Sequence, residues 1–382
     1  MPADSQLAPI TVATPGASYP ILIEGGILTR AGEQLDPVIR GRRVFVLSDN
    51  TVWRFWGKQF LRALAPLRPP VILIPPGERY KRLATVEKIT QALSEYGAER
   101  SSVLLVLGGG VTGDMGGFAA SIFLRGISYV QIPTTLLAQV DSAIGGKTGV
   151  NLIAGKNLAG TFYQPKMVLS DPRVLRTLPP RELRAGLFEA IKCGIIGDPQ
   201  LFDFLESKRD AVLSAQPSAL ERVIRHSSSL KARVVSADEK EGGLRRVLNF
   251  GHTVGHALEA ATGYRHFLHG EAVAWGMLAV NRLAVEQGFL SEEDARRMER
   301  LICLYGPLPP LNNIEPSTVF SHMTADKKVR DGQIHFVLAR KIGQVEVASG
   351  IARTKVIAVL KHLMKHDPFR AKRPGAKARA KK

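Results

Sequence analysis

Residues 103–114 read VLLVLGGGVTGD, an apolar run that leads directly into a cluster of glycines. Consecutive apolar residues without alternation are typical of a strand buried on both faces, as in a parallel sheet. Gly108, Gly110 and Gly113 then follow with the spacing Gly-x-Gly-x-x-Gly, which between a strand and a helix lets backbone amides approach a pyrophosphate. The segment predicts a dinucleotide-binding turn, although a tight glycine turn without a ligand has the same pattern.

Strand and helix patterns around this segment divide the chain in two. Short apolar strands are predicted at 43–48, 71–74, 103–107 and 129–132, separated by helical stretches. This alternation predicts an α/β, Rossmann-like N-terminal domain with a parallel sheet over residues 1–180. Beyond it, helical spacing predicts a mostly α-helical C-terminal domain over 181–365, with a small extended piece at 334–338. Its expected helices cover 181–194, 217–236, 252–262 and 271–287.

Bulk properties favour a cytoplasmic enzyme. The chain has 382 residues and is 45% hydrophobic, enough for two ordinary cores. No apolar run reaches the roughly eighteen residues that a membrane span needs, and the N-terminus lacks the basic and apolar regions of a secretory signal. Cys193 and Cys303 are the only cysteines, which suits a reducing compartment.

The net charge of +18 raises the possibility of nucleic-acid binding. However, residues 370–382 hold seven Lys or Arg and no acid, so much of the excess lies at the C-terminus. We interpret 366–382 as a basic, disordered tail, because it has no apolar face. The alternative is nonspecific polyanion binding by that tail. No specific nucleic-acid partner and no membrane partner are expected.

A Gly-Lys-Thr sequence at 146–148 resembles the end of a phosphate loop. Asp141 stands where such a loop needs glycine, so a nucleoside triphosphatase is rejected. Lys147 can still hold a phosphate as a point charge, with Lys156 and Asn157 as a second contact. The alternative is an exposed loop lysine.

Histidines indicate a metal site in the C-terminal half. His252 and His256 are four residues apart, on one helix face, but Thr253 replaces the glutamate that a metalloprotease needs there. His269 follows thirteen residues after His256, and Glu189 can supply an oxygen ligand. Two histidines and a carboxylate form a common catalytic zinc set. Spacing alone leaves open which two histidines bind the metal. The alternative is that these histidines cap helices or lie on the surface, and that Glu189 pairs with Lys192.

Taken together, these segments resemble the 3-dehydroquinate synthase family of sugar-phosphate cyclases over nearly all of residues 40–350. The blocks that carry the resemblance are PGERYK at 76–81, GGGVTGD at 108–114, FLRG at 123–126, PTTLLAQVDS at 133–142, GGKTGVN at 145–151, LNFGHTVGH at 248–256 and LHGEAV at 268–273.

The resemblance implies NAD and a zinc or cobalt ion as cofactors, and a role for each matching residue. The metal ligands it implies are Glu189, His252 and His269. The NAD-binding residues it implies are Asp49, Glu78, Lys81, Gly109, Gly110, Asp114, Thr134, Thr135, Lys147, Lys156 and Thr177. The substrate-binding or catalytic residues it implies are Arg125, Asp141, Lys147, Asn157, Lys192, Lys231, Glu241, Arg245, Asn249, His256 and one of Lys327 and Lys328.

The activity implied is a carbon-oxygen lyase of the shikimate pathway, which leads to chorismate and the aromatic amino acids. It converts 3-deoxy-D-arabino-heptulosonate 7-phosphate to 3-dehydroquinate and phosphate through transient oxidation by NAD, phosphate elimination, re-reduction and aldol closure. The resemblance also implies a homodimer in which Arg125 reaches the neighbouring subunit's site.

Two other enzyme classes are considered. One is a cyclase of sedoheptulose 7-phosphate or glucose 6-phosphate, against which Arg245 and Asn249 argue, since the resemblance assigns them to the substrate carboxylate. The other is a metal-dependent polyol dehydrogenase, which would release reduced cofactor and has no need for so many lysines.

Overall fold

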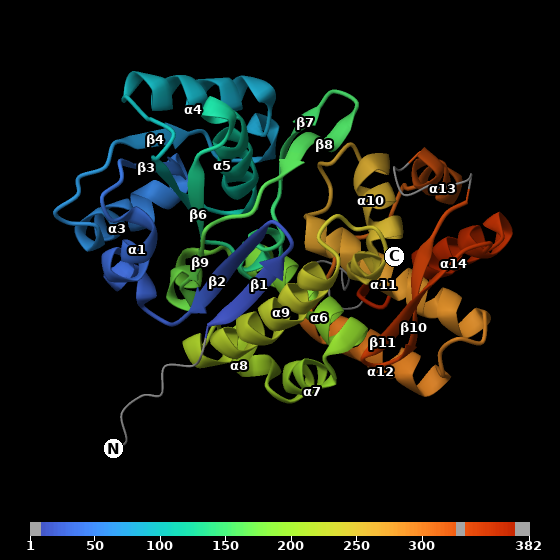
Figure 1. Ribbon diagram of the computed structural model, residues 1–382. Coiled ribbons are helices and arrows are strands. Elements are labelled where there is room, and N and C mark those ends of the chain that lie inside the picture. The colour runs from blue at the N-terminus through green and yellow to red at the C-terminus, as the bar shows by residue number, and fades with distance from the viewer. Residues whose placement is uncertain (1–8, 326–332, 371–382) are drawn as a thin grey trace, which may run out of the picture. The chain divides into compact units, whose positions relative to one another are not determined.

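The computed structural model describes residues 9–325 and 333–370 (Figure 1). The chain forms two compact units. The first comprises the chain up to Pro179 together with Pro217–Lys240, and the second comprises Pro180–Gln216 and the chain from Glu241 onward.

A seven-stranded sheet is the centre of the first unit. Its order is β1-β2-β9-β6-β5-β3-β4, and only the β1–β2 pair is antiparallel. Every residue of β3 and β5 is buried, which explains why both read as unbroken apolar runs. The bounds are β1 Ile10–Thr14, β2 Ala17–Ile23, β3 Val44–Asp49, β4 Val71–Ile74, β5 Val103–Gly108, β6 Ser128–Pro133 and β9 Val168–Ser170. The expected Rossmann-like parallel sheet is confirmed.

The strand order contains a switch point. From β3 the chain moves outward to β4, then returns to the other side of β3 to form β5 and continues through β6 to β9. In sheets of this kind, ligands bind beyond the carboxyl ends of the strands at the position where the order reverses. The switch point lies between β3 and β5, which places the glycine-rich turn there.

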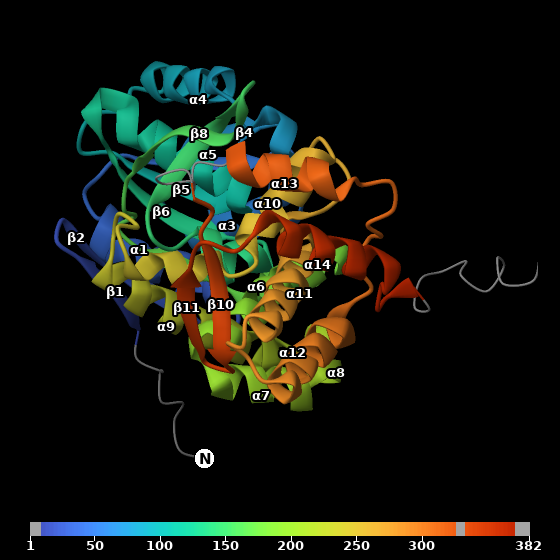
Figure 2. The same ribbon diagram turned by 90° about the vertical axis from the view of Figure 1, so that its right-hand side faces the viewer.

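Helices α4 and α5 lie side by side against this sheet (Figures 1 and 2). Their apolar side chains, Ile89 and Met115 among them, share one core with Leu47 and Val106 of the sheet. A Cβ on Gly116 would lie 2.7 Å from Val106, so glycine lets α5 approach the strands closely. The remaining bounds in this unit are α1 Ala31–Ile39, α2 Asn50–Val52, α3 Lys58–Ala63, α4 Leu83–Glu95, α5 Gly110–Ile122 and the hairpin β7 Lys147–Leu152 with β8 Gly155–Phe162.

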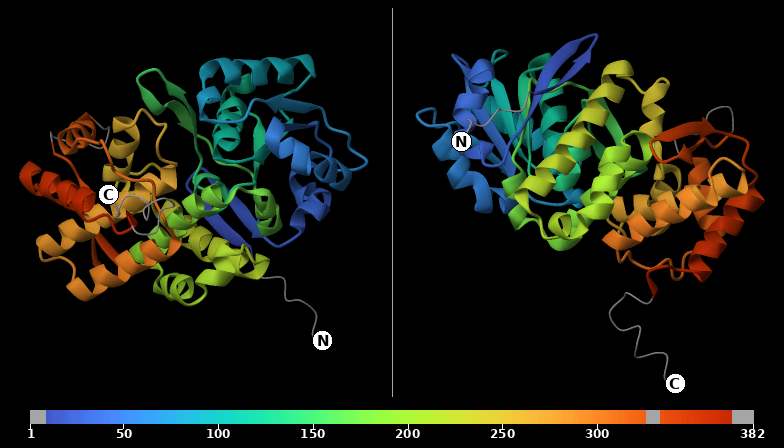
Figure 3. Two further views of the ribbon diagram at one scale, coloured as in Figure 1. Left: turned by 180° about the vertical axis from the view of Figure 1, so that it is seen from behind. Right: turned by 90° about the horizontal axis from the view of Figure 1, so that it is seen from below.

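Helix α9 (Pro217–Ala237) belongs to the first unit, although the sequence places it in the helical domain. It runs along β1 (Figures 1 and 3), where the backbone N–H of Ala13 donates to the Ser236 hydroxyl at 3.0 Å. The Ser228 hydroxyl donates to the carbonyl of Gln139 at 3.2 Å. The chain therefore leaves the first unit after Pro179 and returns to it for Pro217–Lys240.

The second unit is mostly helical, as expected. Strand β10 (Phe336–Lys341) pairs with β11 (Gln344–Ala348) and overlaps the expected extended piece at residues 336–338. It contacts α11 (Figure 2). The helices are α6 Pro180–Gly197, α7 Pro199–Ser207, α8 Arg209–Leu213, α10 His252–Ala261, α11 His269–Glu286, α12 Glu292–Tyr305, α13 Pro316–Ala325 and α14 Arg353–Lys365. No helix in the described ranges is long and apolar enough to cross a membrane.

The beginning of the expected tail is packed. Phe369 is fully buried, and its ring meets Trp275 edge-on with centroids 5.5 Å apart. The aromatic side chain thus anchors the segment just after α14 to the second unit. Residues 371–382 lie outside the described residues.

Close helix packing in the second unit gives a test of the fold. A Cβ on Gly276 in α11 would lie 1.9 Å from the carbonyl oxygen of Gly251. We expect Gly276→Ala to lower the free energy of unfolding by about 3 kcal/mol, because backbone must move to admit the methyl group. Gly243→Ala, whose Cβ would meet nothing within 4 Å, should change it by about 0.5 kcal/mol or less. Urea denaturation followed by circular dichroism measures both; equal effects would contradict the packing.

Candidate functional site

The switch point brings Asp49 beside the glycine-rich turn. The Asp49 carboxylate, at the end of β3, accepts hydrogen bonds from the backbone N–H groups of Thr51 and Val52, both at 3.0 Å. Its other oxygen accepts from the Thr112 hydroxyl of α5 at 3.1 Å. A buried carboxylate is thereby fixed at the carboxyl end of the strand, next to the start of α5.

The glycines of this turn are needed for close approach. Gly109 precedes α5 with a φ of −75°, so a left-handed backbone is not the reason for it. A Cβ on Gly109 would lie 2.8 Å from the Thr135 side chain, and one on Gly110 would lie 2.8 Å from the Ser142 hydroxyl. The hydroxyls of Thr134 and Ser142 are buried without a hydrogen-bond partner within the described residues. Unpartnered hydroxyls beside a helix N-terminus fit a bound dinucleotide phosphate.

A buried lysine connects three segments of the first unit. The Lys81 ammonium donates to Asp114 Oδ2 and to Asn157 Oδ1, each at 2.5 Å. The backbone N–H of Asn157 in turn donates to Asn151, whose amide donates to Glu78 at 2.8 Å. This network fixes the side chains between the loop after β4, helix α5 and the β7–β8 hairpin.

Electrostatics favour the charged form of this lysine. Burial alone would lower the pKa of the Lys81 ammonium, but Asp114 and Glu78 outweigh it and raise the pKa above its usual value. Lys81 therefore keeps its charge at neutral pH. It stands as a fixed cation near the start of α5.

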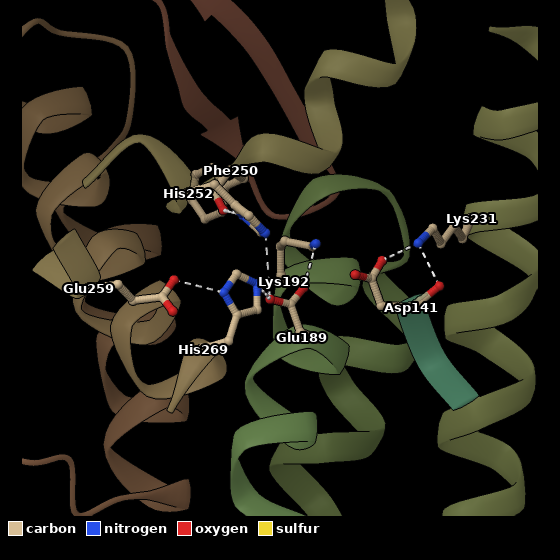
Figure 4. A network of polar contacts seen from close by, with 8 residues as sticks. All are labelled: Asp141, Glu189, Lys192, Lys231, Phe250, His252, Glu259 and His269. Carbon is tan, nitrogen blue, oxygen red and sulfur yellow. Dashed lines mark hydrogen bonds and ion pairs between the residues drawn. The ribbon is translucent and has the colours of Figure 1, made fainter. Parts of the chain in front are cut away.

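A second buried lysine holds the turn before the hairpin. Lys231 of α9 donates to the carboxylate of Asp141 at 2.5 Å and to its backbone carbonyl at 2.6 Å (Figure 4). Lys231 is buried, whereas Lys147, a few residues after Asp141, is exposed at the start of β7. The position of α9 thus brings Lys231 to Asp141, from a segment the sequence placed in the other domain.

In the second unit, α6 carries a buried pair of opposite charges. Glu189 has no exposed surface, and its Oε2 lies 2.5 Å from the Lys192 ammonium. Oε1, the other carboxylate oxygen, has no hydrogen-bond donor among the residues described. A buried oxygen without a donor is a candidate metal ligand.

Two imidazoles face the same oxygen of that carboxylate (Figure 4). Nε2 of His252 lies 3.7 Å from Glu189 Oε1, and Nε2 of His269 lies 3.6 Å from it. The Nδ1 atoms point away: that of His252 lies 3.1 Å from the carbonyl of Phe250, and that of His269 lies 3.0 Å from Glu259. Because both Nδ1 partners are acceptors, each ring carries a proton on Nδ1, and in the neutral rings the Nε2 lone pairs face Glu189.

This arrangement fits a metal ion. Ligand atoms around a tetrahedral zinc lie about 3.4 Å apart, close to the separations at Glu189. His256 is also near, since the three histidines offer ligand atoms within 4.8 Å of one another. Glu189, His252 and His269 would hold the metal, with His256 as the adjacent imidazole.

A polar cluster precedes α10 in the same unit. The amide of Asn249 donates to Glu241 at 2.6 Å, and Arg245 between them is 1% exposed. Burial of a guanidinium is costly unless it meets an anion or strong acceptors. These residues form a polar group of the kind that binds a carboxylate.

Comparison with known sequences identifies the family. A family model described as 3-dehydroquinate synthase N-terminal matches residues 71–185, and the corresponding C-terminal model matches 186–329. The chain belongs to the 3-dehydroquinate synthase family. A 3-dehydroquinate synthase of Solibacter usitatus is 49% identical over 92% of this chain and 98% of its own length. One from Gloeobacter violaceus is 50% identical over 88% and 94%.

Solved structures of other cyclases resemble the chain closely. A 2-epi-5-epi-valiolone synthase of Streptomyces hygroscopicus with NAD+ and Zn2+ bound has a TM-score of 0.85 at 33% identity, covering 92% of this chain and 98% of its own. A 2-deoxy-scyllo-inosose synthase, complexed with carbaglucose-6-phosphate, NAD+ and Co2+, has a TM-score of 0.83 at 26% identity, covering 93% and 99%.

Residues expected from the 3-dehydroquinate synthase resemblance fall into several groups. Asp49, Gly109, Gly110, Thr134 and Thr135 meet at the switch point, and Glu189, His252, His256 and His269 meet in the second unit. Thr177 instead accepts a hydrogen bond from Trp56 at 3.0 Å. Lys156 lies in β8, and Arg125 is exposed after α5. Lys327 and Lys328 lie outside the described residues.

Two polar residues of this synthase family member are not singled out by the sequence. Glu259 meets His269, and the Ser142 hydroxyl lies beside Gly110. A signal for Glu259 exists, because it follows His252 by two helical turns and therefore shares a helix face with His252 and His256. Ser142 carries no comparable signal.

The contact with Glu189 predicts that His252 is a metal ligand. His252→Ala should weaken zinc binding by more than about 100-fold, because a direct ligand costs more than an outer-shell partner. His362→Ala, on α14, should leave it unchanged. Competition with a chromophoric chelator measures the affinity. Equal affinities of the two variants would contradict the assignment.

Proposed function

We propose that the chain catalyses the 3-dehydroquinate synthase reaction, converting 3-deoxy-D-arabino-heptulosonate 7-phosphate to 3-dehydroquinate and phosphate. Curated relatives with this name are 46–50% identical over most of the chain. The observation that carries the proposal is the polar segment before α10, where the Arg245 guanidinium is 1% exposed and the Asn249 amide donates to Glu241. A guanidinium and an amide are donors that suit the carboxylate of this substrate.

We further propose that NAD and a zinc or cobalt ion are the cofactors. When bound, NAD would accept a hydride from carbon 5 and later return it, and the metal would polarise the hydroxyls there. The switch point in the first unit fits the dinucleotide, with Asp49, the glycine turn and Thr134 as its residues. Glu189, His252 and His269 fit the metal.

The remaining residues would bind the two anionic ends of the substrate and orient them. Arg245 and Asn249 take the carboxylate, since a guanidinium and an amide both donate to carboxylate oxygens. Lys147, Asn157 and His256 hold the phosphate, so that one of its own oxygens takes the proton from carbon 6 as it leaves. The resemblance assigns one of Lys327 and Lys328 to the substrate, and that lysine would complete the group of substrate-binding residues.

Quaternary structure and compartment are also proposed. Arg125 is exposed at the end of a short helical turn, with a φ of 68°. In a homodimer this side chain would reach the neighbouring subunit's site. The two cysteines, one of them buried, suit the cytoplasm.

The reaction gives a direct test. Purified protein with a catalytic amount of NAD and added zinc should release stoichiometric phosphate from the heptulosonate phosphate, without accumulating NADH, because the hydride returns within each turnover. Phosphate is measured by a colorimetric assay and NADH by its absorbance. NADH that grows with turnover would favour a polyol dehydrogenase instead.

Substrate preference separates the cyclases. Sedoheptulose 7-phosphate lacks the carboxylate, so its kcat/KM should be lower by at least about 100-fold, because it cannot accept the hydrogen bonds that Arg245 and Asn249 would donate. Arg245→Gln should remove most of that preference. Wild-type preference for sedoheptulose 7-phosphate would instead favour the cyclases that act on sugar phosphates without a carboxylate.

A further inference from the structure

We propose that Glu259 is a positioning residue that fixes the proton and the orientation of His269 for metal binding. This inference rests on the proposed function, since it assumes that His269 binds the metal. Glu259 is described above only as the partner of His269 Nδ1. Its position on α10 and the exposure of His269 give it a further role.

Glu259 and the histidines share one face of α10. His252, His256 and Glu259 are spaced by four and then three residues, so all three project to the same side of the helix. Across from them, His269 begins α11, and its Nδ1 lies 3.0 Å from Glu259 Oε2 (Figure 4). Glu259 therefore reaches the one ring of the cluster that comes from a different helix.

The contact determines which nitrogen of His269 is available. An ionised carboxylate only accepts hydrogen bonds, so His269 must carry its proton on Nδ1. In the neutral ring, the form that binds metal, the lone pair then lies on Nε2, the atom 3.6 Å from Glu189. A carboxylate on the far side of a metal-binding imidazole is a recurrent arrangement that sets the tautomer and the ring orientation.

His269 needs this contact more than His252 does. The His252 side chain is 9% exposed and is oriented by a backbone carbonyl, whereas the His269 side chain is 29% exposed. A less enclosed ring can rotate about its side-chain bonds unless something holds it. Glu259, which is 3% exposed, supplies that restraint.

Other contacts hold the two helices without Glu259. Arg181 donates to both oxygens of Glu271 at 2.6 and 2.7 Å, and Glu271 accepts from the backbone N–H of Leu268 at 2.8 Å, which anchors the start of α11. Gly255 packs so closely on α11 that its Cβ would lie 3.0 Å from the carbonyl of Ala272. A variant at Glu259 therefore keeps the supports that place the His269 backbone.

The test compares metal affinity among matched variants of the full chain. Glu259→Gln keeps the shape but removes the charge, and Glu259→Ala removes the acceptor. Zinc affinity is measured by chelator competition, and cobalt-loaded protein by its visible absorption, which reports coordination geometry. Glu206→Gln is the control, since it breaks a partly buried ion pair with Arg297 away from the histidines.

We expect zinc affinity to fall roughly 10–100-fold in Glu259→Gln and further in Glu259→Ala, with an altered cobalt spectrum. Glu206→Gln should match the wild type. If both Glu259 variants bind zinc like the wild type while His269→Ala does not, or if they only lower the melting temperature of the metal-free protein, the inference is overturned. Wild-type protein that binds no zinc would instead overturn the proposed function.

Discussion

The carboxylate of Glu189 is the constraint on which the second unit depends. It is fully buried on α6, and its Oε1 has no hydrogen-bond donor among the described residues. Lys192 supplies one positive charge 2.5 Å from Oε2, and the Nε2 atoms of His252 and His269 lie 3.7 and 3.6 Å from Oε1. A metal ion at Oε1 would satisfy that oxygen and both imidazoles together. Helices α6, α10 and α11 each supply part of this group, and α11 packs against both of the others.

The first unit follows a different constraint, the reversal of strand order between β3 and β5. In sheets of this kind ligands bind beyond the strand ends at such a reversal, and α5 begins there with the glycine-rich turn. Lys81, Asp114 and Asn157 fix the surrounding segments through hydrogen bonds. The described geometry of the first unit thus fits a dinucleotide, and that of the second unit fits a metal ion.

Much of this architecture is predictable from sequence. Buried parallel strands read as continuous apolar runs, and the expected strand at 71–74 matches β4 residue for residue. Helix α9 is also visible as a helix, but its assignment to the first unit is not, since an amphipathic pattern shows that one face is buried and not which core buries it. Helix spacing brings His252 and His256 together without deciding which of them binds metal.

Other features of the site depend on contacts that sequence cannot show. Glu259 becomes informative only when α11 places His269 opposite it, and the Trp56 contact of Thr177 joins residues 121 positions apart. The resemblance to the family assigns roles to individual residues that spacing alone leaves open. At Glu189 the structure gives the physical reason, because it shows which side chains lie around the carboxylate.

The central claim, that Glu189, His252 and His269 hold the metal and His256 does not, is tested most directly by X-ray absorption at the zinc edge. Zinc-loaded protein should show only nitrogen and oxygen ligands, and the spectrum of His256→Ala should match the wild type. Loss of an imidazole signal in His256→Ala, or a sulfur ligand from Cys193, would contradict the account.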